Sequence, residues 1–431
     1  MHRHEGTEAR HEVVREGKRQ EVHSLLSSPP GPHSVPSCLR AFVPLLIILL
    51  ASSTSADLRT YTTNHYRIQT DVDPVLADDL AHRMDAMYDE YARRLADFSS
   101  QQGNRLFDVY IFQHHGEYIN FTNNRFPNTG GVFMSGKALA AFLEGQGRDQ
   151  LRRTLQHEAF HQFAFTAVGP KLPVWINEGL AQIFEEGIYN GKTFQIGEIP
   201  PRRVRQLQHD IDDRNLFDFQ SFLSMSDKQW AENLAANKEL GGRQYNQAWA
   251  MAHYLIFSDD AMGPPQFRRR LIDMLKRVHN GENGTDAFVS AFSDNYAGFQ
   301  QMFLNYARRM KPTPVATYIE NQDILADMMI ELNSRGQRFN TIPNLRRALI
   351  RGRYQVIYTR GGLQWKSSAD PNEYFRDLEG NDLGGDQLYL EQRNGAPLPD
   401  IISRPMPGLQ LHTRFSQTGD KIEHEIVVET P

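Results

Sequence analysis

The feature that most constrains the fold is one long helix. Residues 148–168, RDQLRRTLQHEAFHQFAFTAV, have strong helical character. Gly169 and Pro170 end this helix, because glycine adopts a left-handed cap and proline cannot continue the turn. Apolar residues flank the HEAFH segment and predict a buried side: Leu151, Leu155, Phe160, Phe163 and Phe165. The chain must therefore build a larger body around this helix.

Composition removes several protein classes. The 431 residues are 40% hydrophobic and 23% charged, which excludes a wholly disordered, collagenous or membrane-bundle protein. Lys and Arg total 47 against 52 Asp and Glu, so the net charge of -5 supplies no basic field for nucleic acid. The single cysteine, Cys38, can form neither an internal disulfide nor a zinc site with two thiolates. Any metal must be bound by nitrogen and oxygen ligands.

The N-terminal segment differs from the rest of the chain. Residues 1–36 have the composition of a non-native or disordered extension, and we hypothesise that translation starts near Val35. Residues 37–56 are predicted to be a signal peptide, because an eleven-residue apolar run (41–51) precedes small residues suited to cleavage. Cleavage before Asp57 would give an exported protein, periplasmic or secreted, without a stable transmembrane anchor. An uncleaved N-terminal anchor is the alternative.

We expect an α+β fold in two parts. The first, residues 57–312, is expected to place a mixed sheet over the HEAFH helix and to continue as a mainly helical subdomain. Its expected strands are 66–72, 107–112 and 130–135, and its expected helices are 74–98, 148–168, 174–186, 245–257, 266–279 and 285–310. The second part, residues 313–431, is expected to hold one helix (323–333) and a small β-rich domain with strands 354–359, 363–366, 409–416 and 422–428.

The HEAFH segment carries the chemistry. Four residues along a helix place His157 and His161 one turn apart on the same face, where both can reach one cation. Glu158 lies at the side of that face, in the position of a general base that does not itself bind the ion. Burying these groups without partners would be costly, and a metal would satisfy them. The alternative is a surface helix whose histidines face water.

The third expected ligand is Glu178 in the following helix, which can fold back beside the first. Two imidazoles and one carboxylate suit one Zn²⁺ per chain, with a fourth position open to an activated water. Glu185 and Glu186 are alternative ligands, but we expect them to be solvated charges at an exposed helix end. Gly179 and Ala181 are small, as close packing of two helices around a metal requires.

HEAFH followed by WINEGLA resembles the gluzincin branch of zinc metallopeptidases, the peptidase MA-like group. The closest resemblance is to the bacterial domain of unknown function 1570 family, and it covers about residues 61–310. The resemblance implies a zincin fold with His157, His161 and Glu178 as zinc ligands and Glu158 as the catalytic base. Two features depart from it: the spacing before Glu178 is slightly short, and Gln182 stands where an acidic residue is often found.

Two further elements have possible catalytic roles. The helix YNQAWAMAHYLIF offers Tyr245 and His253 as second donors to an oxyanion, and we favour Tyr245. The competing interpretation makes both residues core or rim side chains, and Trp175 and Trp249 are predicted to be packing residues. The strand GGVFMS (130–135) is a candidate sheet edge for an extended peptide, with an interior strand as the alternative.

The predicted function is that of an exported zinc-dependent metallopeptidase that hydrolyses peptide bonds in a peptide or protein substrate. The alternative is a catalytically inactive binding module for a peptide or a cell-envelope component. A third interpretation is a membrane-associated structural protein.

Overall fold

The computed structural model describes residues 57–99, 105–262, 266–360 and 363–430. The predicted extension (1–36), translation start and signal peptide (37–56) lie outside the described residues. Within the described ranges, no helix is both long and apolar enough to cross a membrane. The fold contains both helices and several sheets, so the predicted α+β class is confirmed.

A five-stranded mixed sheet forms the first layer. Its strand order is β1 (Arg59–Thr62), β2 (Tyr66–Thr70), β3 (Phe107–Phe112), β5 (Ala138–Phe142) and β4 (Gly131–Met134). The pairs β2/β3 and β3/β5 are parallel, whereas β1/β2 and β4/β5 are antiparallel. Strands β2, β3 and β4 were predicted from the sequence; β5 was not, because its ALAAF sequence is buried at every position and does not alternate. The interior alternative for β4 is wrong, because β4 ends the sheet.

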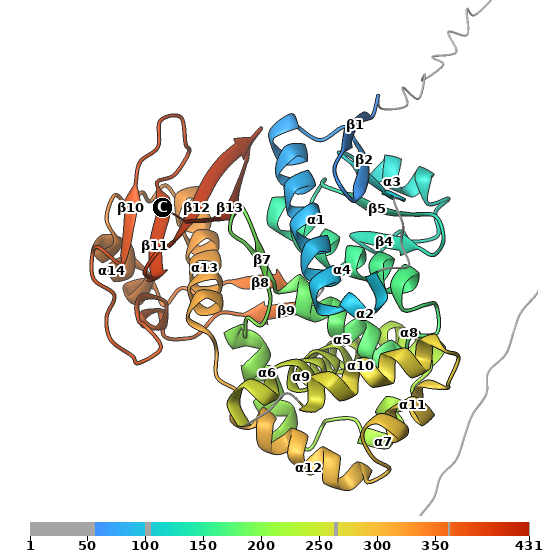
Figure 1. Cartoon of the computed structure of the whole chain (residues 1–431). Coiled ribbons are helices and arrows are strands. Elements are labelled where there is room, and N and C mark those ends of the chain that lie inside the picture. The colour runs from blue at the N-terminus through green and yellow to red at the C-terminus, as the bar shows by residue number, and fades with distance from the viewer. Residues whose placement is uncertain (1–56, 100–104, 263–265, 361–362, 431) are drawn as a thin grey trace, which may run out of the picture. The chain divides into compact units, whose positions relative to one another are not determined.

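Helices α1 (Pro74–Arg94) and α4 (Arg148–Ala167) pack beside this sheet (Figure 1). The predicted long helix at α4 is confirmed almost to the residue. The helix predicted over 74–98 is wrong at its end, because α1 stops before Leu95 and a separate short helix, α2 (Ala96–Ser99), follows. The next element after β3 is α3 (His115–Phe121).

Helix α5 (Val174–Glu185) packs between α4 and α9 (Lys238–Met262). A Cβ atom added at Gly179 would lie 2.5 Å from the backbone oxygen of Ala248 in α9. Only glycine permits this approach, as expected from the small residue next to Glu178. The predicted helix 174–186 is confirmed, and the predicted 245–257 is the inner part of the longer α9.

The remaining elements before residue 312 are mostly helical. They are β6 (Ile188–Tyr189), β7 (Phe194–Gln195), α6 (Pro201–Asp212), α7 (Phe219–Leu223), α8 (Asp227–Ala236), α10 (Gln266–His279), α11 (Gly284–Ala291) and α12 (Tyr296–Ala307). The single helix predicted over 285–310 is wrong. Asn295 caps a new helix by accepting from the Gly298 N–H, so the chain divides into α11 and α12.

The C-terminal region begins with α13 (Pro314–Ser334), which starts nine residues before the predicted Asp323. It continues with α14 (Ile342–Gly352), the hairpin β8 (Ile357–Arg360)/β9 (Leu363–Lys366) and the 3₁₀ turn η1 (Pro371–Phe375). A four-stranded antiparallel sheet follows, in the order β10 (Leu388–Glu391), β11 (Asp400–Met406), β12 (Leu409–Thr418) and β13 (Lys421–Glu429). The β-rich character was predicted; α14, β10 and β11 were not.

Two large hydrophobic clusters underlie these two parts. One draws its buried residues from 66–310 and the other from 324–415. The first turns of α4 meet β13 through polar contacts: Arg152 pairs with Glu425 at 2.9 Å, and the Ile426 N–H donates to Asp149 at 2.7 Å. The C-terminal sheet therefore packs against the start of the helix that carries HEAFH.

Candidate metal centre

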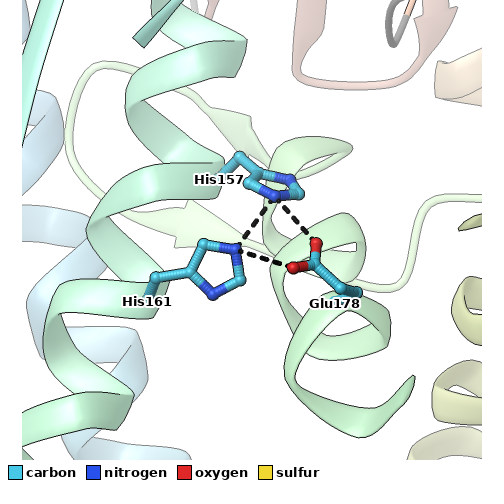
Figure 2. A group of neighbouring side chains, drawn as sticks. All are labelled: His157, His161 and Glu178. Atoms are coloured by element: carbon cyan, nitrogen blue, oxygen red, sulfur yellow. Dashed lines mark hydrogen bonds and ion pairs between the residues drawn. The ribbon is translucent and has the colours of Figure 1, made fainter. Parts of the chain in front are cut away.

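Helices α4 and α5 bring three predicted side chains together. Figure 2 shows His157 and His161 from α4 and Glu178 from α5 pointing toward a common point. The two Nε2 atoms lie 3.0 Å apart. Glu178 Oε2 lies 3.3 Å from His157 Nε2, and Glu178 Oε1 lies 3.6 Å from His161 Nε2. One ligand atom from each residue can be chosen so that all three lie within 4.8 Å of one another. We call these three residues the metal group.

Hydrogen bonds on the far side of each ring define the imidazole tautomers. His161 Nδ1 lies 3.1 Å from Asn177 Oδ1, and His157 Nδ1 lies 3.1 Å from Glu185 Oε2. Both partner atoms are acceptors, and the Gln182 amide, 3.3 Å from His157 Nδ1, donates to Glu185 Oε2 at the shorter distance of 2.8 Å. Each Nδ1 is therefore assigned a proton, and in its neutral form each ring has its lone pair on Nε2. The two lone pairs then face each other at 3.0 Å, an arrangement that requires a proton or a cation between them.

The spacing and donor set fit zinc. A tetrahedral ion with bonds of about 2.05 Å places its ligand atoms about 3.3 Å apart. The three distances in the metal group, 3.0, 3.3 and 3.6 Å, surround that value. Glu178 Oε2 is also buried and has no hydrogen-bond partner in the part of the chain that the structure describes. A buried carboxylate oxygen without a donor is costly, and a cation at this point would satisfy it.

The electrostatics of the metal group reflect the same convergence. Burial disfavours the charged form of each side chain. The attraction between the imidazoles and the carboxylates outweighs burial, so the pKa values of His157 and His161 are raised and the pKa of Glu178 is lowered well below its usual range. The histidines have only about 14% and 13% of their side chains exposed, so the alternative of a surface helix with solvated histidines is wrong.

Glu185 orients His157, which contradicts its expected place at an exposed helix end. Its residue exposure is 6% and its Oε2 accepts from the Gln182 amide at 2.8 Å as well as from His157. The Gln156 amide donates to the backbone oxygens of Phe184, Glu185 and Gly187 and so fixes the end of α5.

Glu186 is also buried rather than solvated. It is 7% exposed and pairs with Arg202 at 2.5 Å, Arg203 at 2.6 Å and Arg153 at 3.3 Å. Burial opposes its charge, but the three guanidinium groups hold its pKa well below the usual range. The sequence suggested exposure because α5 ends here; α6 and α4 cover this end with arginines. Glu186 lies outside the metal group, and its three ion pairs join the end of α5 to α4 and α6.

Glu158 lies between the metal group and the sheet edge. Its Oε2 accepts a hydrogen bond of 2.7 Å from the backbone N–H of Phe133 in β4. Since β4 is the terminal strand, the carboxylate is held by the same edge that the sequence singled out as a peptide-binding candidate.

Of the two proposed oxyanion donors, only Tyr245 is electrostatically coupled to the metal group. Its pKa is raised by burial and by the negative charges of Glu178, Glu158 and Glu185, while its ring packs edge-on against Trp230 at 5.2 Å. His253 instead bonds to Tyr306 and the Gly197 backbone, and it is 3% exposed. Trp175 and Trp249 are fully buried, which confirms their predicted packing role.

Sequence reasoning missed Asn177 and Glu185 as partners of the imidazole rings. A signal for both was present. Asn177 immediately precedes Glu178, and Glu185 lies seven residues after it on the same face of α5. Whether Glu185 is a hydrogen-bond partner of His157 or a solvated charge depends on which elements cover the end of α5, and the sequence does not specify those elements.

Comparison with known proteins gives one match. Residues 152–262, which span the metal group and all of α9, match the family described as Protein of unknown function (DUF1570). This bears out the resemblance to that family over the segment concerned. No curated protein is similar enough to the chain to count as a match.

Proposed function

We propose that this protein is a zinc-dependent hydrolase of peptide bonds, with a zincin-like fold and a gluzincin-like site. The observation that supports it most is the convergence of two imidazole Nε2 atoms and the Glu178 carboxylate, with Glu158 next to His157 in the chain. The sheet edge β4 beside this group supports the assignment to peptide substrates, because an extended peptide can add to a terminal strand.

The chain supplies the ligands and the means of holding them. A zinc ion bound by His157, His161 and Glu178 would supply a Lewis acid and an open coordination position for water and the scissile carbonyl. Asn177 and Glu185 orient the two rings so that both lone pairs remain directed inward. Burial of the metal group excludes bulk water, which strengthens each charge interaction there.

Glu158 is the general base in this proposal. Its carboxylate takes one proton from the attacking water as the new C–O bond forms. It then delivers that proton to the nitrogen as the C–N bond breaks, so that an amine and a carboxylic acid leave. The Phe133 N–H holds one oxygen of Glu158 at 2.7 Å and leaves the other to face the water.

Tyr245 is proposed to stabilise the negative charge that develops on the carbonyl oxygen. The raised pKa keeps its hydroxyl protonated and able to donate at neutral pH.

We also propose that the chain is exported and cleaved before Asp57. Mass spectrometry of the exported protein tests this, and a mature N-terminus well upstream of Asp57 would refute it.

Metal content and hydrolysis test the proposal together. Purified protein should carry one zinc per chain and hydrolyse an unstructured protein, with turnover lost on chelation and restored by zinc. The variant Glu158→Gln should keep the zinc and lose turnover. Zinc bound at the metal group without chelator-sensitive hydrolysis would refute the peptidase and favour the alternative of a binding module for a peptide or cell-envelope component.

A further inference from the structure

A cavity of about 320 Å³ lies beyond the metal group along α4. Phe133 from β4, Phe107 from β3 and Phe165 from α4 give it aromatic walls, and Gln162 contributes an amide. Charged residues complete the lining: Arg105, Asp108 and Lys137. The Phe133 and Phe165 rings meet edge to face with centroids 5.6 Å apart. The volume lies at the lower end of the roughly 300–1,000 Å³ range of ligand pockets. The cavity therefore suits a small, flat apolar group.

The α4 residues that line the cavity follow the proposed catalytic residues along one side of that helix. Glu158, His161, Gln162 and Phe165 follow one another at spacings of three, one and three residues, and so share one side of the helix. The Phe133 residue whose backbone N–H holds Glu158 is the same residue whose ring lines the cavity. Phe133 therefore links the cavity to the Glu158 carboxylate.

Gln162 provides an unpaired acceptor beside the aromatic walls. The residue is 3% exposed, and its Nε2 donates to the backbone oxygen of Asp108 at 3.1 Å. That bond fixes the orientation of the amide, because a carbonyl can only accept. Its Oε1 is buried and has no hydrogen-bond partner among the residues that the structure describes. A buried acceptor is costly when unpaired, so a ligand with a donor is favoured over one without.

The distance from the metal group defines where such a ligand belongs. Phe165 lies four residues after His161, which is about 6 Å along the helix. An extended peptide advances about 3.3 Å per residue. Strand β4 runs beside α4, since a Cβ at Gly131 would meet Thr154 at 2.6 Å while Phe133 contacts Glu158 and Phe165. A peptide along β4 would place a side chain one or two residues from the scissile bond at the cavity.

We propose that this cavity binds an aromatic side chain with a donor at its edge, the hydroxyl of tyrosine or the indole N–H of tryptophan, next to the bond that is cleaved. The position next to the cleaved bond rests on the proposed function. The binding of the aromatic group in the cavity does not depend on that function. The rings of Phe107, Phe133 and Phe165 contact the aromatic face, and Gln162 Oε1 accepts from the edge donor.

Binding is tested without hydrolysis by NMR titration of the full protein with four probes: the N-acetyl amides of tyrosine, tryptophan, phenylalanine and leucine. Tyrosine and tryptophan amides should bind roughly fivefold more tightly than phenylalanine amide, because one hydrogen bond is added, and leucine amide should bind most weakly. Gln162→Leu should remove the advantage of tyrosine amide over phenylalanine amide.

A second variant, Phe165→Ala at a partly exposed position, should weaken the binding of all the aromatic probes. It provides the test if Gln162→Leu does not fold. The exposed change Glu239→Gln on α9 lies outside the cavity lining, is the control, and should change neither the affinity nor the selectivity for the probes.

A peptide library then separates this inference from the proposed function. Cleavage with tyrosine or tryptophan enriched within two residues of the bond, and lost in Gln162→Leu, would support both. Cleavage without aromatic preference, or equal binding of the tyrosine and leucine amides, would overturn the cavity assignment and leave the hydrolase intact. Selective binding of the tyrosine amide without any cleavage would overturn the hydrolase and keep the cavity as an aromatic site.

Discussion

The two ends of α4 differ in how their polar groups are satisfied. In the first turns, Arg152 pairs with Asp79, Asp149 and Glu425 at 2.8–2.9 Å, and Asp149 also accepts from the Ile426 N–H. From His157 onward, the Nε2 atoms of the two imidazoles lie 3.0 Å apart. Gln162 Oε1 on α4 and Glu178 Oε2 on the neighbouring α5 are buried without hydrogen-bond partners among the described residues. Helix α4 therefore joins a fully paired ion network to a region with unpaired acceptors.

This contrast divides the polar residues near α4 into those that stabilise the fold and those that are proposed to bind a metal or ligand. Paired buried charges hold β13 and the C-terminal region against α4, and their loss should affect folding. Unpaired acceptors in a native interior need an explanation, and the proposed cation and ligand donor would supply it here. Changes in the first set should alter the free energy of unfolding, and changes in the second should alter binding and turnover.

The largest effect is expected at Glu158. Replacement by Gln removes the base while preserving size, so turnover should fall by roughly 10²–10⁴-fold with zinc content unchanged. Steady-state hydrolysis and metal analysis of the same sample measure both. Glu239→Gln, an exposed change on α9, is the control and should match wild type. Loss of zinc in Glu158→Gln would show that this carboxylate is part of the metal site rather than the base.

A second ion network, around Glu186 and Glu320, offers a matched pair of arginines. Arg202 and Arg205 both pair with Glu320, but their side chains are 6% and 59% exposed. Arg202→Met should lower the free energy of unfolding by about 3 kcal/mol, because it leaves buried carboxylates short of a partner. Arg205→Met should cost less than about 1 kcal/mol. Urea unfolding measures both, and equal costs would contradict the distinction between buried and exposed pairs.

Glu185 should affect metal affinity without being a ligand. Glu185→Gln weakens the hydrogen bond that orients His157, and zinc affinity should fall by roughly 10–100-fold. Glu185→Asp should recover part of the loss. Competition with a chromophoric chelator gives the affinities, with Glu239→Gln as the control. An unchanged affinity would mean that Glu185 only packs the end of α5.

His253 gives the expected pH dependence of stability outside the metal group. Burial lowers the pKa of His253 to about 4, whereas the unfolded chain titrates near about 6.5. Because the unfolded state binds more protons between these values, the neutral ring's stabilisation is present above pH 6.5 and is lost as pH falls toward 4. From pH 7 to 5 the loss should be about 2 kcal/mol. His253→Gln removes the titrating group, so the slope of unfolding free energy against pH should be shallower; an equal slope would contradict the assignment.

The sequence predicts local structure and chemistry better than it predicts which side chains are buried by neighbouring elements. The α4 boundaries, the strands at 66–70 and 107–112, and the identities of the converging residues followed from helical spacing and alternation. Strand β5 was missed because a run of alanines carries no pattern, and the division of 285–310 depended on one capping side chain, Asn295. The burial of Glu185 could not be predicted, because it depends on tertiary packing of α6 and α4.

Crystals of the protein soaked with zinc and measured at the zinc absorption edge test the central claim most directly. The account predicts one anomalous peak per chain at about 2.0–2.2 Å from His157 Nε2, His161 Nε2 and a Glu178 oxygen, absent in crystals of Glu178→Gln soaked identically. A peak elsewhere with none among these three side chains, or imidazole rings turned away from each other, would contradict it.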